Sequence, residues 1–334
     1  MANYTIFDEQ YYLAQYPWLQ PAIDTGVIQS GREHFEKFGQ AAGLTQVSRY
    51  FDEATYLAGN PDVAALVRTP NNPNAPFATG LDHFIQYGYE EGRTRVSPDY
   101  DEAFYLKKYP QLAASVENGT FKSGFEHFVK SGAKEGLYGN TFFEAQYLLE
   151  NPTVATAVKA GDFKTGGEHY RKFGQFEPAR TASFFGTSGN DILTGFGVGN
   201  VELIGVEVGV NINGGREYKS GGSDEFDTLI GGSGSDTFVF GYTLITSNSI
   251  GKLVSRDQLL YQGPGFATIQ NFTQGQDRIQ LPFGDKYRIF PINNNRDLAI
   301  QLFGTDTIAV IEGGGNLSLN QLPVRGGPLI TLLG

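Results

Sequence analysis

Aromatic and leucine residues recur at helical spacing in four related stretches of the first half of the chain. The stretches are FDEQYYLAQYP, FDEATYLAGNP, YDEAFYLKKYP and FFEAQYLLENP. The aspartate in the first three is expected to cap a helix N-terminus, and the proline is expected to begin a second helix. The caps are Asp8, Asp52 and Asp101, and the prolines are Pro17, Pro61 and Pro110. Phe143 replaces the cap in the fourth copy, so that helix should begin less sharply.

A second phrase follows each stretch and holds one of the four histidines. Its copies are SGREHFEKFG, TGLDHFIQYG, SGFEHFVKSG and TGGEHYRKFG. Serine or threonine followed three residues later by an acidic residue is a capping-box signature, so each phrase predicts a short helix. The closing glycines fit left-handed residues just beyond the helix end. They are Gly39, Gly88, Gly132 and Gly174.

The two phrases together form a repeating unit. Its leucines, Leu13, Leu57, Leu106 and Leu148, are spaced by 44, 49 and 42 residues, and the longest copy carries the Pro/Asn-rich insertion RTPNNPNAPFA. Insertions confined to loops are typical of repeat architectures. We therefore predict an all-α array of four helical repeats over residues 1–183.

The repeated histidine has three interpretations. Each histidine lies in an apolar stripe, which favours a buried structural role with one ring nitrogen bonded to a backbone carbonyl. A shared metal site and catalysis are the alternatives, and no HExxH, GxSxG or Walker-type sequence accompanies them. The histidines are His34, His83, His127 and His169.

The chain changes character near residue 184, after which its 44 glycines are concentrated. GTSGNDILTG and GGSDEFDTLIGGSGSDTFVFG match the nonapeptide G-G-x-G-x-D-x-U-x of parallel β-rolls. Glycines allow the tight turns, the aspartate points into the turn, and the next large apolar residue enters the core. FATIQNF, DRIQL, LAIQLF and DTIAVIEG predict further strands. Residues 184–334 should therefore form a parallel β-roll or β-solenoid, which makes the chain an α+β multidomain protein.

Residues 186–241 resemble the RTX, or haemolysin-type, calcium-binding repeats, and FATIQNFTQGQDRIQL resembles the strand that closes such rolls. The resemblance implies bound Ca²⁺, whose oxygen ligands would come from stacked turns. It assigns the metal site to Asp191, Asp227, Asp236, Asp277, Gly186, Gly189, Gly231, Gly232 and Gly234.

Three departures reduce the expected number of ions to between about one and three. Residues 196–220 leave the repeat frame, Asp224 stands where glycine is expected, and Asn271 replaces the usual aspartate. A roll whose altered sites bind little calcium is the alternative.

The helical units, residues 7–178, resemble repeats of about 45 residues that accompany such calcium domains in bacterial exported and surface proteins. RTX-like proteins use a C-terminal segment for type I secretion, which agrees with an N-terminus that lacks a signal-peptide pattern and with the apolar tail LPVRGGPLITLLG. The resemblance thus implies an extracellular or cell-surface location. No transmembrane segment is expected, because no apolar run is long enough.

Composition narrows the partners and the chemistry. A net charge of −11 without a basic stretch argues against nucleic acid, and the lack of cysteine excludes disulfides and thiolate sites. The only candidate catalysts are the adjacent carboxylates Glu90/Glu91 and Asp224/Glu225, for which solvated charge is the simpler explanation. We therefore do not expect an enzyme.

The favoured hypothesis is a non-catalytic exported or cell-surface protein, structural or adhesive, in which a calcium-stabilised β-roll carries helical repeats that bind a protein or matrix partner. Tyr11, Tyr12, Tyr16 and Trp18 of those repeats are either core or binding surface. The alternative is an intracellular scaffold or linker in a large assembly, for example a light-harvesting one, with vestigial calcium sites. Oligomerisation is compatible with both.

Overall fold

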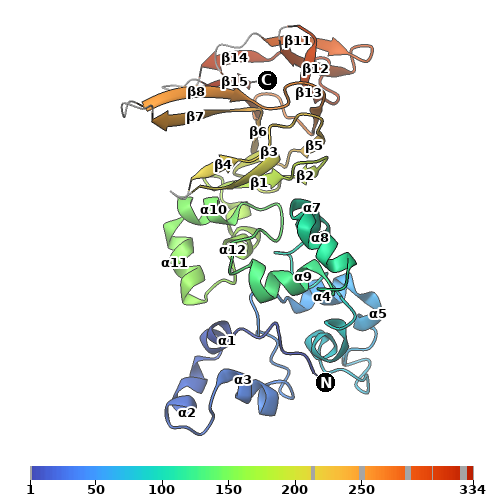
Figure 1. The fold of residues 1–334 in the computed structure, drawn as a ribbon, viewed down its shortest axis with the longest axis vertical. Helices are drawn as coiled ribbons and strands as arrows, with labels where there is room; N and C mark the ends of the chain where they lie inside the picture. Colours follow the sequence, from blue (N-terminus) through green and yellow to red (C-terminus); the bar gives the residue numbers. More distant parts are fainter. Residues whose placement is uncertain are drawn as a thin grey trace. The chain divides into compact units, whose positions relative to one another are not determined.

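The computed structural model describes residues 2–211, 215–247, 253–282, 287–302, 304–323 and 329–333 (Figure 1). Helices occupy the N-terminal half and strands in parallel and mixed sheets occupy the C-terminal half, so the chain is α+β as predicted. Two compact units are present. The first comprises Met1–Asn140 with Pro152–Glu168, and the second comprises Thr141–Asn151 with His169–Gly334.

The first helix of each repeat begins where the sequence predicts. These helices are α1 (Glu9–Gln15), α4 (Glu53–Gly59), α7 (Glu102–Lys108) and α10 (Glu144–Glu150). The carboxylates of Asp8, Asp52 and Asp101 each accept a hydrogen bond of 2.7–2.9 Å from the amide three residues later, which confirms them as N-caps. Phe143 gives α10 no side-chain cap.

The second helical segment starts at the predicted proline or next to it, because proline has the fixed φ of a helix start and needs no amide partner there. The segments are η1 (Pro17–Leu19) with α2 (Gln20–Asp24), α5 (Pro61–Ala64), α8 (Pro110–Glu117) and α11 (Pro152–Ala160).

The third helix carries the histidine. The copies are α3 (Gly31–His34), α6 (Gly80–His83), α9 (Gly124–His127) and α12 (Gly166–Lys172). In all four, the predicted serine or threonine accepts a bond of 2.9–3.1 Å from the amide three residues later. The first three continue into one π-helical turn, namely η2 (Phe35–Gly39), η3 (Phe84–Gly88) and η4 (Phe128–Gly132), whereas the short 3₁₀ segment η5 (Gly174–Phe176) follows α12.

The predicted role of the closing glycines is wrong. None of the four, Gly39, Gly88, Gly132 and Gly174, has a positive φ. In the first three repeats the left-handed residue comes four positions later, at Gly43, Gly92 and Gly136, with φ between 69° and 77°. The closing glycines are instead required by space, because a Cβ at each would lie closer than 3.0 Å to the hydroxyl of a buried tyrosine.

A recurring backbone bond closes each repeat on itself. The amide at the start of the first helix donates to a carbonyl about 40 residues later at 2.8 Å in every copy. The pairs are Asp8 with Val47, Asp52 with Val96, Asp101 with Gly139, and Phe143 with Ser183. In the last pair the acceptor belongs to the first β-strand.

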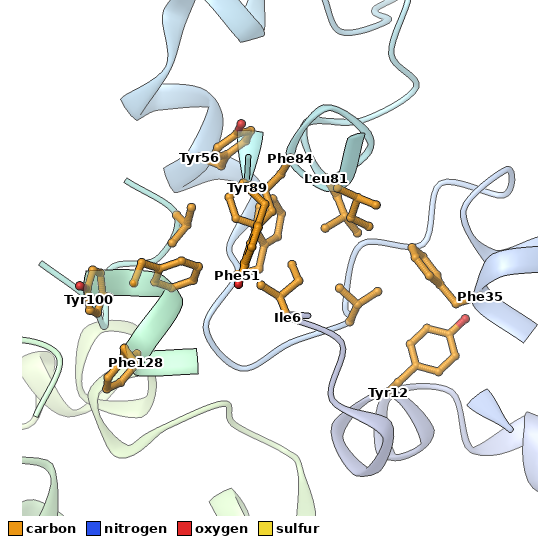
Figure 2. Close-up of a cluster of buried hydrophobic side chains, with 14 of the residues drawn as sticks. Ile6, Tyr12, Phe35, Phe51, Tyr56, Leu81, Phe84, Tyr89, Tyr100 and Phe128 are labelled. Atoms are coloured by element: carbon orange, nitrogen blue, oxygen red, sulfur yellow. The ribbon is translucent and has the colours of Figure 1, made fainter. Parts of the chain in front are cut away.

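The core of the first unit is largely aromatic (Figure 2). Tyr12, Phe35, Tyr56 and Phe84 are completely buried in it, and their rings meet at tilted or edge-on angles with centroids 5.4–5.8 Å apart within a repeat. Such geometry is favourable for aromatic pairs beyond the area that they bury. The spacing that recurs among the four repeats therefore mainly places aromatic side chains in the core.

The strands of the second unit alternate between two sheets. The seven-stranded sheet has the order β1-β3-β6-β10-β15-β14 with β4 paired to β3, and the six-stranded sheet has the order β11-β12-β13-β9-β5-β2. The first sheet contains β1 (Thr181–Gly186), β3 (Asn200–Val210), β4 (Arg216–Tyr218), β6 (Ser235–Val239), β10 (Arg278–Pro282), β14 (Asn320–Pro323) and β15 (Leu329–Leu333). The second contains β2 (Ile192–Thr194), β5 (Phe226–Ile230), β9 (Phe266–Gln270), β11 (Tyr287–Ile292), β12 (Asp297–Leu302) and β13 (Asp306–Ile311).

Pairing is parallel along β1-β3-β6-β10 and along β2-β5-β9-β13, and the remaining pairs are antiparallel. The hairpin β7 (Gly241–Ser247) and β8 (Leu253–Leu259) forms a separate two-stranded sheet. Residues 324–328 and 334 of the predicted C-terminal signal, and Phe303 of LAIQLF, lie outside the described residues.

No helix within the described ranges combines the length and the apolar character needed to cross a membrane.

Gly132→Ala is expected to lower the free energy of unfolding by about 1–3 kcal/mol, because the new methyl group would overlap the Tyr105 hydroxyl. Gly221→Ala is the control, since its Cβ would have nothing within 4 Å. Urea titration measures both. Adding Tyr105→Phe to Gly132→Ala should recover part of the loss, and strictly additive effects of the two substitutions would contradict the steric explanation.

Candidate functional site

Each histidine of the helical repeats shares a hydrogen bond with a buried tyrosine. Nδ1 of the ring lies 2.8–2.9 Å from the hydroxyl in every repeat. The pairs are Tyr12–His34, Tyr56–His83, Tyr105–His127 and Tyr147–His169. The predicted backbone carbonyl partner is therefore wrong: the tyrosine that occupies the same position in every first helix supplies the bond.

Each histidine is buried within its own repeat and bonds the tyrosine of that repeat. All four histidines are buried, and 5–9% of each residue's surface is exposed to solvent. Burial lowers the pKa of His34, His83 and His169 below its ordinary value, which favours the neutral ring. Within the described residues, no group of three or more histidine, aspartate or glutamate side chains has an arrangement that could hold a metal ion.

The predicted metal aspartates lie at or next to the first residues of four β-strands. Each precedes by two residues a completely buried apolar side chain, which is the expected alternation along a strand. These apolar residues are Leu193, Leu229, Phe238 and Ile279. The structure groups the aspartates as two stacked pairs in successive strands, Asp191 with Asp227 and Asp236 with Asp277.

The first pair is linked by hydrogen bonds. The Asp191 amide donates to Oδ1 of Asp227 at 2.7 Å, and Oδ2 of Asp227 accepts from the Tyr261 hydroxyl. Oδ2 of Asp191 accepts from both the amide and the hydroxyl of Thr187, at 2.7 and 2.9 Å. Lone pairs of these carboxylate oxygens thus already accept hydrogen bonds from the protein, and a carboxylate needs free lone pairs to coordinate a cation.

The second pair is different. The Asp236 amide donates to Oδ1 of Asp277 at 2.9 Å, and Oδ2 of Asp277 accepts from the Thr273 amide at 2.7 Å. The Asp236 carboxylate is completely buried, and neither of its oxygens makes a hydrogen bond of good geometry, although the Gly232 backbone amide favours its charged form. Burial and then the charge of Asp277 raise the pKa of Asp236 to about 7, and burial also raises the pKa of Asp277.

Glu225 is a second carboxylate inside this unit without a full set of partners. Its residue is 4% exposed and its Oε2 has no hydrogen-bond partner. Burial, followed by the charge of Asp227, raises its pKa to about 7. The neighbouring Asp224 has φ 63°, which explains why an aspartate occupies the position expected for glycine: Asp tolerates the left-handed region better than most residues.

The other adjacent carboxylates are engaged in ion pairs. Glu90 pairs with Lys122 and accepts from the Asn3 side chain at 3.0 Å, while Glu91 accepts from Arg93 at 2.8 Å.

The predicted turn glycines stand where neighbouring backbone or a carboxylate comes close. A Cβ at Gly231 would lie 2.7 Å from Oδ2 of Asp236, and one at Gly186 would lie 2.8 Å from Oδ2 of Asp191. A Cβ at Gly232 or Gly234 would approach the carbonyls of the preceding turn, and Gly189 lies in the bend before β2. None of these five has a positive φ, so close approach rather than left-handed geometry requires glycine at Gly186, Gly231, Gly232 and Gly234.

Several residues of these sites were not predicted. Thr187 and Thr273 each lie four residues before their aspartate, and this shared Thr-x-x-x-Asp spacing was the available signal. Tyr261 lies 34 residues after Asp227 with no motif around it. In the helical unit, the missed residues are the glutamates that follow each aspartate cap and accept the first amides of the third helix at 2.5–3.1 Å: Glu9, Glu53 and Glu102.

Comparison of the chain with protein-family models, with curated proteins and with solved structures finds no match.

The imidazoles of His34, His83 and His169 are expected to titrate below about pH 6.5, the ordinary histidine value. Because the unfolded chain binds these protons more readily, the contribution of the neutral rings to stability is complete above pH 6.5 and is lost as the pH falls below that value, through the lower folded-state pKa values. NMR titration of the ring resonances measures the pKa values directly. Midpoints at or above 6.5 would show that the rings are not held neutral by burial.

Asp236→Asn is expected to raise the free energy of unfolding of the calcium-free protein at pH 8 by about 1–2 kcal/mol. The folded-state pKa of about 7 exceeds the ordinary unfolded value, so the contribution of Asp236 to stability is complete below the unfolded pKa and is lost as the pH rises toward 7. The neutral amide removes that loss. Urea titrations in chelator at pH 5 and pH 8 measure the difference.

Asp297→Asn is the matched control for this substitution. Asp297 is equally inaccessible, but its carboxylate accepts from Asn293, Arg296 and the Gly313 amide, and these partners lower its pKa. The asparagine variant should therefore be less stable than wild type at pH 8. The same sign of change at both positions would argue against an uncompensated charge at Asp236.

Proposed function

We propose that the chain is a non-catalytic structural or adhesive protein of the cell surface or exterior, in which a calcium-stabilised β-roll of the RTX type carries helical repeats that bind a partner. The observation that carries the proposal is the carboxylate of Asp236, which lies buried beside Asp277 and whose oxygens make no hydrogen bond of good geometry. A protein interior retains a buried charge only where a partner compensates it or where a proton neutralises it.

The strand topology supports the roll. The chain passes from one sheet to the other and back, and each pass adds a parallel neighbour to the strand before it. The first pass is 19 residues, from Thr181 to its partner Asn200, which is close to two nonapeptides. Later passes are longer because β4, the β7–β8 hairpin and the β11–β12 hairpin are inserted between turns. The irregular frame of the sequence thus reflects insertions into a regular path.

The residues around Asp236 fit a hard cation. Calcium takes six to eight oxygens, including carboxylates, backbone carbonyls and water. A Cβ at Gly231 would fill the space 2.7 Å from Oδ2 of Asp236 and 3.4 Å from the carbonyl oxygen of Asn271, so glycine leaves both oxygens facing one space. Bound Ca²⁺ would supply positive charge there. Asp236 and Asp277 would hold it with carbonyl oxygens of the turn.

The pair Asp191–Asp227 fits a cation less well, because Thr187 and Tyr261 already donate to it. This observation favours the second candidate function, an intracellular scaffold whose remaining aspartates act only as hydrogen-bond acceptors. At cytosolic calcium levels, far below the 10⁻⁴–10⁻³ M dissociation constants typical of extracellular modules, the Asp236 site would be empty. The calcium dependence of stability therefore separates the two candidates.

Calcium is expected to raise the melting temperature of the full chain, with a midpoint on the order of 10⁻⁴–10⁻³ M and no equal effect of magnesium. A ligand that binds only the folded state adds about 2.7 kcal/mol at a hundredfold excess over its dissociation constant. Thermal unfolding followed by circular dichroism measures the shift. Asp236→Asn should remove most of it and Asp297→Asn should keep it. An identical melting temperature in chelator and in excess calcium would favour the scaffold.

A further inference from the structure

The helical repeats carry a second recurring surface feature beside the Tyr–His pair. In the first three repeats an aromatic ring from the segment before the third helix meets the buried histidine edge-on, at an interplanar angle of 84° and centroid distances of 4.9–5.3 Å. The rings are Trp18, Phe77 and Phe121. Four residues after the histidine come Phe38, Tyr87 and Ser131, and in the second repeat Tyr87 also meets Phe77 edge-on at 5.8 Å.

The first two of these patches expose large aromatic surface. Trp18 and Phe38 lie next to His34 and are 61% and 56% exposed, and Tyr87, beside His83, is 51% exposed. Phe38 and Tyr87 each lie 5.9 Å from their histidine at the same angle of 44°. The third patch has the same histidine and edge-on ring but a serine in place of the exposed aromatic. We call Trp18–His34–Phe38 and Phe77–His83–Tyr87 the aromatic patches.

A hollow adjoins the second patch. It has a volume of about 360 Å³ and is lined by Ala2, Gln40, Gln86 and Tyr87. Gln40 follows Phe38 of the first patch by two residues, and its Oε1 accepts from the Tyr4 hydroxyl at 3.1 Å. Planar amides beside an exposed phenol ring offer hydrogen bonds and an apolar face together, which is the combination that a sugar ring can use.

We infer that the aromatic patches bind a neutral polysaccharide. This deepens the partner-binding part of the proposed function and rests on it. Two similar patches on successive repeats match a ligand that is itself a repeat, because each added contact then occurs at high effective concentration. A folded protein partner would instead need one continuous interface of about 800 Å² on this side.

Charge selects a neutral polymer over an acidic one. The chain has a net charge of −11, and burial lowers the pKa of both patch histidines, so no fixed positive charge lies within the patches. Nucleic acids and acidic polysaccharides would be repelled by the field of the whole molecule. Aromatic ring faces instead favour the C–H surfaces of uncharged sugars.

The test is binding of the full-length protein to neutral glucan and N-acetylglucosamine oligomers, with polygalacturonate as the acidic probe, by isothermal titration calorimetry. At least one neutral oligomer should bind, and Phe38→Ser and Tyr87→Ser, which copy the third repeat, should each weaken binding about fivefold or more. Ser131→Phe should strengthen it. Ile192→Ala, at an exposed apolar residue of β2 in the strand-rich unit, should have no effect.

The inference is overturned if no neutral oligomer binds, if only the acidic probe binds, or if the double variant Phe38→Ser/Tyr87→Ser binds as tightly as wild type. Light scattering tests self-association: a dimer that the double variant converts to monomer would assign the patches to a second copy of the chain. Urea titration of the double variant checks that it folds. Calcium-dependent melting is measured separately, so failure of sugar binding and failure of the calcium-stabilised roll give different results.

Discussion

In each helical repeat a tyrosine hydroxyl and a histidine ring nitrogen share a hydrogen bond inside an aromatic core, and the rest of the repeat is organised around that bond. The tyrosine comes from the first helix and the histidine from the third, so the bond fixes how the two helices pack. The bonded hydroxyl also leaves no room for a side chain on the residue beside it, which is why a glycine such as Gly88 is needed there. An unpaired hydroxyl or imidazole in this core would cost about 1–3 kcal/mol.

The strand-rich unit also buries polar groups, but the hydrogen bonding of some of its buried carboxylates is incomplete. Asp191, Asp227 and Asp277 accept from amides and hydroxyls, whereas both oxygens of Asp236 and one of Glu225 make no hydrogen bond of good geometry. Nearby negative charges make this more unfavourable, since each raises the pKa of its neighbour. The stability contributions of the histidines and of these carboxylates therefore respond to pH in opposite directions. Protonation of the histidines in acid lowers the free energy of unfolding, and ionisation of these carboxylates at higher pH also lowers it.

The local elements of the repeats were predictable because their signals are local. Asp52 as a cap, Pro61 as a helix start and Thr79 as a second cap each depend on residues within one helical turn. The Tyr56–His83 bond joins residues 27 apart, and neither polar group signals its partner in the sequence. The role of Gly88 depends on that bond, so it was misassigned to helix termination.

Predictability fell further in the strands. The Asp-x-apolar spacing placed the inward positions correctly at Asp227 and Asp236, because alternation along a strand is a short-range property. Which aspartate stacks on which, and which carboxylate makes no hydrogen bond of good geometry, depends on strands up to 41 residues apart and on inserted hairpins. The motif therefore proposed calcium at all four aspartates alike, and only the packing singles out Asp236 among them.

The closing bond of the fourth repeat reaches a strand, whereas those of the other three reach the irregular segment that precedes the next repeat. Phe143 donates to Ser183 and Phe185 donates to Thr141, so residues 141–143 cover the outer edge of β1. Uncovered edge strands are sites of strand-to-strand aggregation. Helical repeats could therefore be gained or lost ahead of the fourth one without disturbing this joint, whereas a fragment beginning at residue 184 would lack both residues 141–143 and the first half of β1, and would leave a sheet edge uncovered.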